Sequence, residues 1–135
     1  MITQIKGETI VRKATAKAST AYALNGIVAF DGSGHVIPAT NATTVANMVG
    51  LIDRAIASTD DDYASEKTVG VILFHDGAEF EGDVSGGTLD ADDIGTNVDL
   101  VNSETLDGSG TATVDQFTIT DVLGSGDKAR FVLNN

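Results

Sequence analysis

Acidic residues are the side chains with the clearest capacity for chemistry in this chain, and they gather in two short runs. Residues 58–66 read STDDDYASE and residues 90–93 read DADD. Carboxylate oxygens are ligands that Ca2+ prefers, so the two runs could build one calcium site if they met in space. The weak candidates for metal ligands are Asp60, Asp61, Asp62, Asp90, Asp92 and Asp93.

The first run also fits a simpler role as an exposed bend between two strands. Three adjacent carboxylates repel one another, and on an extended backbone their side chains fan outward. A calcium ion would need the loop to curl so that further oxygens converge on it. We therefore expect Asp60 to Asp62 to form a solvated turn, and Tyr63 to cap the core or to contact a second copy of the chain.

The two histidines, His35 and His75, are the remaining candidates for catalysis, and each lies beside an Asp-Gly turn. No G-x-S-x-G turn is present, and no spacing couples a serine to either histidine. The chain has no cysteine, which excludes a thiol nucleophile and a thiolate zinc site. We expect a protein that is not an enzyme and needs no cofactor. A small hydrolase or lyase ranks last, because sequence order does not reveal a triad.

Charge is distributed unevenly along the chain, whose formal net charge is −12. The first 17 residues hold four cations and one glutamate, a net of +3, so the remainder sums to −15. Such an acidic body repels nucleic acid, whereas the basic stretch predicts contact with an acidic partner. Plain surface charge on a first strand is the alternative. The four cations are Lys6, Arg12, Lys13 and Lys17.

Turn signals divide the rest of the chain into short segments. Asp-Gly pairs suit the positive φ angles of tight hairpins and would destabilise a helix. Between the turns the residues alternate: residues 78–84, AEFEGDV, place apolar side chains on one face and acids on the other. Residues 116–120, QFTIT, predict Phe117 and Ile119 inward and Gln116 outward. Residues 69–74, VGVILF, predict a strand covered on both faces.

These segments predict an all-β fold, a single small β-barrel or sandwich-like domain of about eight short strands with one or two single-turn helices. A length of 135 residues suits one domain. We divide it into a basic N-terminal arm or first strand at 1–20 and a compact β domain at 21–135. Single-turn helices are expected near 43–48 and 90–94. Further strands are expected at 9–12, 27–30, 35–37, 49–56, 97–101 and 129–133.

Apolar runs in the sequence are too short for a signal peptide or a membrane span. We therefore expect a protein made in the cytoplasm that binds no membrane.

Several segments in a fixed order, spread over nearly all of the chain, resemble a known family. In chain order they are KGETIVRKATAKAS, GIVAFDGSGHVIPAT, NATTVANMVGLIDRAI, STDDDYAS, VGVILF, AEFEGDVSGG, LDADDIGTNVDLV and FTITDVLGSGDKARFVLN. This order resembles that of the small head decoration, or cement, proteins of tailed double-stranded DNA phages.

The resemblance implies a non-enzymatic virion protein, made in the host cytoplasm, that binds the outer capsid surface. It implies a homotrimer that bridges neighbouring subunits of the major capsid protein and stabilises the shell. A mobile N-terminal segment could then add a strand to a capsid sheet, with Lys6, Arg12, Lys13 and Lys17 meeting acidic capsid surface. The alternative is a calcium-dependent structural, adhesion or tail-fibre β module.

Overall fold

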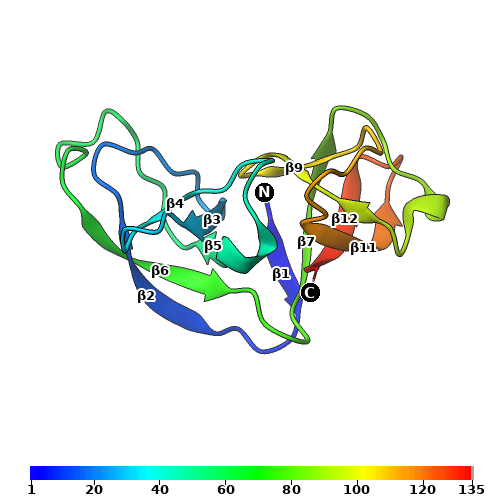
Figure 1. Cartoon of the computed structure of the whole chain (residues 1–135), viewed down its shortest axis with the longest axis horizontal. Coiled ribbons are helices and arrows are strands. Elements are labelled where there is room, and N and C mark those ends of the chain that lie inside the picture. The colour runs from blue at the N-terminus through cyan, green and yellow to red at the C-terminus, as the bar shows by residue number, and fades with distance from the viewer. Residues whose placement is uncertain (135) are drawn as a thin grey trace.

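The chain folds into two β units that share one hydrophobic core (Figure 1). The computed structural model describes residues 1–134, which form twelve strands and two 3-10 turns and confirm the all-β class. The strands are β1 (Thr3–Lys6), β2 (Val11–Ala16), β3 (Ile27–Phe30), β4 (Val36–Pro38), β5 (Met48–Ile52), β6 (Lys67–Leu73), β7 (Glu79–Ser85), β8 (Asn97–Val98), β9 (Leu100–Asn102), β10 (Thr105–Asp107), β11 (Phe117–Leu123) and β12 (Lys128–Leu133). The two turns, η1 (Val45–Asn47) and η2 (Ala91–Asp93), lie where single-turn helices were expected. None of the described helices is long and apolar enough to cross a membrane.

Five strands close into a barrel in the order β2-β4-β3-β5-β6. β2 pairs with antiparallel β6 along its whole length, whereas it meets β4 in a single parallel pair, Ala16 with Val36. The hydroxyl of Tyr22 reinforces that junction, because it accepts the N–H of Lys17 at 2.9 Å and donates to the C=O of Val36 at 2.6 Å. The barrel is therefore closed at one end of β2 and less tightly closed along the rest of it.

The other seven strands form a sheet in the order β8-β11-β12-β7-β10-β9, with β1 also pairing with β7. β10 runs parallel to β7, and the other pairs in this sheet are antiparallel. The first strand of the chain thus completes the sheet built by its C-terminal half. Within residues 1–20, β1 belongs to the sheet and β2 belongs to the barrel.

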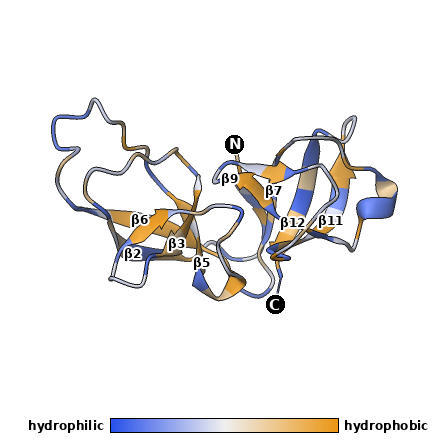
Figure 2. Ribbon diagram, turned by 45° about the horizontal axis from the view of Figure 1, so that its top comes forward, coloured by the Kyte–Doolittle hydropathy of each residue, from blue (hydrophilic) through white to orange (hydrophobic). Residues whose placement is uncertain are grey.

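A shared core holds the sheet against the barrel. The fully buried rings of Phe80, Phe117 and Phe131 on the sheet belong to one apolar cluster with Ile27 and Leu51 of the barrel. The rings of Phe117 and Phe131 meet edge to face with centroids 5.0 Å apart, an arrangement that aromatic quadrupoles favour. Figure 2 shows how much of the apolar sequence lies in the strands of both units.

β3 and β5 are covered on both faces, which explains why their sequences do not alternate. Val28 and Val49 face the barrel interior, while Ile27 and Leu51 pack toward the sheet. The sequence predicted such double cover for residues 69–74, and it holds there in part: β6 buries Val69 and Val71 inside the barrel, while Ile72 is only partly buried against the shared core. The fully covered strand is β5, because it lies between the barrel interior and the sheet.

The alternation of apolar and polar residues predicts correctly which side chains of β7 are buried, but it fails at Gln116, which precedes β11. The residues of β7 alternate between buried and partly exposed, with Phe80 and Val84 inward. Gln116, which was expected to face solvent, is fully buried. Its side-chain amide donates to the C=O of Thr40 at 2.8 Å and of Thr43 at 2.7 Å, so it ties the sheet to the loop that follows β4.

Candidate functional site

The loop that carries the first acidic run is a series of hydrogen-bonded turns. The N–H of Asp60 donates to the C=O of Ala57 at 3.0 Å, and a carboxylate oxygen of Asp60 accepts the N–H of Ala57 at 2.9 Å. The N–H of Tyr63 then donates to the C=O of Asp60 at 3.1 Å. One of the three carboxylates is therefore used to shape the turn, while Asp61 and Asp62 are exposed.

Lys67, at the start of β6, holds the far end of this loop. Its ammonium group donates to the C=O of Asp62 at 2.6 Å and of Ser65 at 3.0 Å, and it lies 3.7 Å from a carboxylate oxygen of Asp62. The Lys67 side chain is nearly buried, so these carbonyls replace the water that its charge would otherwise bind. The cation that this loop binds is thus the ammonium group of Lys67.

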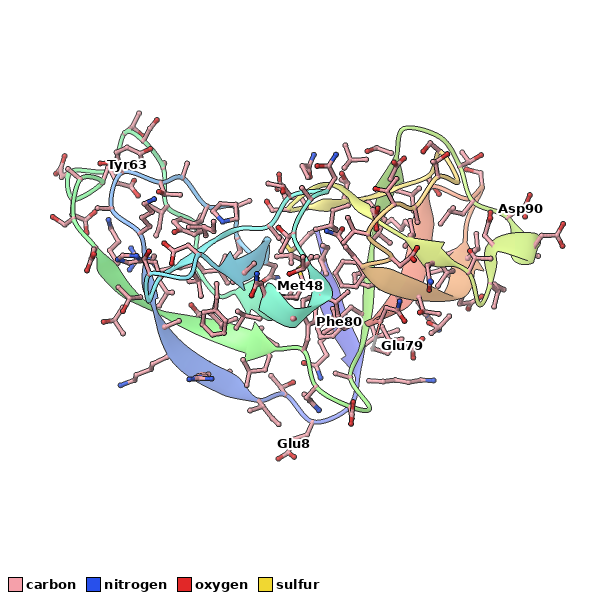
Figure 3. All side chains as sticks on the ribbon, in the orientation of Figure 1. Glu8, Met48, Tyr63, Glu79, Phe80 and Asp90 are labelled. Carbon is pink, nitrogen blue, oxygen red and sulfur yellow. The ribbon has the colours of Figure 1, made fainter. Side chains whose placement is uncertain are left out.

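The second acidic run caps a short turn. Asp90 accepts the N–H of Asp92 at 2.9 Å, and Asp93 accepts the N–H of Asp90 at 2.8 Å, which is a reciprocal capping box around η2. Tyr63 and Asp90, labelled in Figure 3, mark the two runs at opposite ends of the molecule. The hypothesis that the runs meet in space is wrong, because one lies on the barrel and the other on the sheet.

The six aspartates therefore do not converge on one point, as a single calcium ion held by both runs would require. In the described part of the chain, no group of three or more histidine, aspartate or glutamate side chains is arranged to hold a metal ion.

Tyr63 is half-buried and packs against the apolar cluster inside the barrel. Its C=O accepts the N–H of Ser19 at 2.8 Å, which fastens the acidic loop to the segment after β2. The packing of Tyr63 agrees with the first role expected for it, which is to cap the core. Its second expected role, contact with another copy of the chain, stays a prediction.

His35 lies between two carboxylates. Its Nδ1 is 3.1 Å from Asp31 in the β3–β4 turn, and its Nε2 is 2.6 Å from Glu66 at the end of the acidic loop. The hydrogen bond to Glu66 raises the pKa of His35, the hydrogen bond to Asp31 adds to this, and partial desolvation opposes both. The pKa of Asp31 is lowered, chiefly by the N–H of Ser33. His35 thus links the hairpin to the acidic loop.

The ring nitrogens of His75 form hydrogen bonds with two backbone carbonyls. Its Nε2 lies 2.6 Å from the C=O of Glu8, and its Nδ1 lies 2.9 Å from the C=O of Asp76. It borders a cavity of about 450 Å3 next to Phe74 and Leu133. Within residues 1–134, neither histidine forms a hydrogen bond with a serine hydroxyl.

The four predicted basic residues do not form one patch. Lys6 lies on β1 in the sheet, with its ammonium group 3.4 Å from the carboxylate of Glu79. Arg12 and Lys13 lie on β2 in the barrel, and Lys17 follows that strand. Within residues 1–134, none of these three has a carboxylate within 4.0 Å. The stretch expected to be a mobile arm instead forms two paired strands, β1 and β2, and only the cations on and after β2 lack an ion partner among residues 1–134.

A groove opens beside these cations, between β2 and the β3–β4 hairpin. It has a volume of about 200 Å3, and Arg12 and Lys13 border it on one side while Phe30 borders it on the other. Val49 and Val71, from the barrel interior, line its apolar part. Sequence reasoning missed Phe30 as a surface residue, since IVAF predicts a buried strand and only the tertiary fold leaves this ring 43% exposed.

Comparisons with known proteins give structural likenesses but no sequence match. No protein-family model matches the chain, and no curated protein matches it at a significant level. One solved structure with a similar course of the chain is the head fiber gp8.5 N base of bacteriophage phi29, at 15% sequence identity and a TM-score of 0.49, covering 93% of this chain and 95% of that one. A TM-score below 0.5 at this identity establishes neither a shared fold nor a shared function.

Proposed function

We propose that this chain is a non-enzymatic structural protein of a tailed phage, which binds the outer capsid surface and stabilises the shell by bridging subunits of the major capsid protein. The observation that carries the proposal is the exposed basic strand β2 on a chain of net charge −12. Cations with no internal partner attract an acidic surface, while the acidic remainder keeps the particles apart in solution.

The order of the sequence segments supports the choice of partner, because it resembles that of phage head decoration proteins along nearly the whole chain. A homotrimer would present three basic strands at once. Each contact could then be weak, since binding of the first copy raises the effective concentration of the other two.

The contact would be made by a folded edge rather than by a mobile arm. Deleting residues 1–17 would remove β1 from the sheet and β2 from the barrel, so that deletion would test folding rather than binding. Substitutions of Arg12 and Lys13 should leave the fold intact, because both side chains are exposed and have no ion partner in the described chain.

Purified virions of the phage that encodes this chain provide the test. Quantitative mass spectrometry should find the chain in near-stoichiometric amount with the major capsid protein, and virions lacking it should release their DNA at a lower temperature. Sedimentation of the isolated chain checks the trimer. Absence from virions, or a few copies per particle, would contradict the proposal.

A further inference from the structure

The edge of β2 that faces away from β6 has unused backbone groups. In an antiparallel ladder, successive residues turn their N–H and C=O alternately to one side and to the other. Gly70, the partner of Lys13 on β6, directs both groups away from β2: its N–H donates to a carboxylate oxygen of Asp53 and its C=O accepts the N–H of Asp53, both at 3.0 Å.

Lys13 must therefore turn its own N–H and C=O away from β6, and by alternation so do Val11 and Thr15. The neighbour on that side, β4, pairs with β2 only at Ala16. Within residues 1–134, the alternation and this single pair leave the N–H groups of Val11 and Lys13 without a strand to receive them. Such an edge is a template for another strand.

The surroundings of this edge define the strand that fits it. The groove beside it is several times larger than the roughly 30 Å3 share of one water molecule. Phe30 and Val49 make its wall apolar, while Arg12 and Lys13 bring unpaired positive charge to its rim. A segment that alternates apolar and acidic side chains would place the first kind in the groove, on the face of β2 that carries Ala14, and the second on the opposite face, where Lys13 lies.

We propose that the open edge of β2 binds an extended acidic–apolar segment of another protein, which adds to the barrel as a further strand beside Val11–Thr15. This binding mode deepens the proposed function. It depends on the proposed function only in one respect, which is that the major capsid protein supplies the segment. A segment of a second copy is the competing occupant, and charge alone would permit it, because the rest of this chain is acidic.

The test uses the isolated chain and a capped synthetic peptide of alternating valine and glutamate. We expect binding that weakens as salt is added, because the contact is partly ionic. Lys13→Glu should weaken it about tenfold, since the substitution replaces attraction by repulsion. The matched control is Arg54→Glu, which makes the same charge change at an exposed barrel residue away from the groove.

The backbone contribution is tested separately from charge. Lys13→Pro removes an N–H that β6 does not use, so the barrel should persist while peptide binding is lost; Lys13→Ala, which keeps the N–H, should lose only a few-fold. If Lys13→Pro fails to fold, a peptide that is N-methylated on its β2-facing amides tests the same backbone hydrogen bonds, because it removes the donors of the peptide. This peptide should not bind. A valine–lysine peptide should not bind.

Hydrogen exchange gives a direct readout of strand addition. In the free chain the amides of Val11, Lys13 and Thr15 should exchange quickly, whereas those of Arg12 and Ala14, which face β6, should be slow. The peptide should protect the first three and leave the other two unchanged.

Three results would overturn the proposal. The first is that the N-methylated peptide binds as tightly as the unmethylated one, and the second is that the peptide protects amides outside β2 from exchange. The third is that the isolated chain forms an oligomer that Lys13→Glu dissociates and the peptide does not. The last would assign the edge to a second copy. None of these measurements involves a capsid, so a chain absent from virions that still binds the peptide would refute only the proposed function.

Discussion

The sheet and strand β2 of the barrel treat their positive charges in opposite ways. On the sheet, Arg130 lies 3.4 Å from Glu81, and Lys128 lies 3.6 Å from Asp83, each across a pair of neighbouring strands. On the barrel, Arg12 and its neighbours on β2 have no carboxylate within 4.0 Å in the described chain. The sheet neutralises its own cations, whereas β2 of the barrel carries cations that have no carboxylate partner in the described chain.

Asp83 shows how complete this neutralisation is on the sheet. Its carboxylate accepts the N-terminal ammonium group at 2.8 Å and also faces Lys128. The hydrogen bond from the N-terminus is the main cause that lowers the pKa of Asp83. The start of the chain is thus fastened to the sheet by charge as well as by β1. The unpaired cations of β2 are therefore the contrast on which the proposed binding surface rests.

The largest predicted effect is on the free energy of unfolding, and it tests whether the two units unfold together. A methyl group at Gly50 would lie 1.9 Å from the carbonyl oxygen of Ile72 on the neighbouring strand, and backbone cannot yield as a side chain can. We expect Gly50→Ala to lower the free energy of unfolding by about 3 kcal/mol or more. Urea unfolding followed by circular dichroism measures this.

The shared core predicts that barrel and sheet are lost in one transition in this variant. The control is Gly32→Ala, where nothing lies within 4 Å and only a φ of +81° opposes the methyl group, at a cost of about 1–2 kcal/mol. Two separate transitions, with only the first shifted, would mean that the sheet is stable without the barrel.

The next effect compares a buried carboxylate of the sheet with the exposed run of the barrel. Asp99, 4% exposed, accepts the N–H groups of Thr113, Val114 and Gln116. Asp99→Asn places an amide against these donors and should cost on the order of 3 kcal/mol at neutral pH. Asp61→Asn, on the exposed run, should change stability by less than about 0.5 kcal/mol.

The same substitution has a pH signature. Desolvation raises the pKa of Asp99, but the backbone hydrogen bonds from Val114, Thr113 and Gln116 together outweigh it, so the pKa is lowered. A lowered pKa contributes stability above the unfolded value of about 3.9, and that contribution is lost as the pH falls through the folded value. The gap between wild type and Asp99→Asn should close in acid; a gap independent of pH would assign it to shape alone.

A smaller and opposite pH effect is expected on the barrel. The raised pKa of His35 means that its ion pairs with Glu66 and Asp31 stabilise the fold fully below about pH 6.5 and lose that contribution as the pH rises through the folded value. Wild type should therefore exceed His35→Gln in melting temperature more at about pH 5.5 than at about pH 8.5. Glu66→Gln should reduce this difference, and an unchanged difference would show that Glu66 is not the partner that matters.

Local sequence pattern predicted the elements whose environment is simple. β7 alternates because one of its faces is buried, and the turn at η2 follows from its run of aspartates. The pattern could not reveal that β5 is covered twice, because a continuous apolar run does not say what lies on either side of it. β1 and β10 were missed for a related reason: each is short and depends on pairing with β7.

Long-range contacts set what the sequence could not predict about the candidate site. Gln116 is buried because carbonyls more than seventy residues away need its amide, and no local signal records that. The basic residues of the N-terminal stretch were recognised by charge alone. That β2 lies in the barrel and pairs with β4 only at Ala16, while Lys6 pairs on the sheet, follows from topology.

The smallest predicted effect separates the two kinds of cation most directly. Arg130→Ala removes ion pairs with Glu81 and Asp121 and should cost about 0.5 kcal/mol of stability at low salt, whereas Arg12→Ala should cost nothing measurable. In 1 M salt, where charges are screened within about 3 Å, the two variants should become equal. In peptide binding the order should reverse, with Arg12→Ala weakened and Arg130→Ala unaffected. A loss of stability in Arg12→Ala equal to that in Arg130→Ala would mean that the β2 cations serve the fold, and the contrast between the two units would no longer indicate a binding surface.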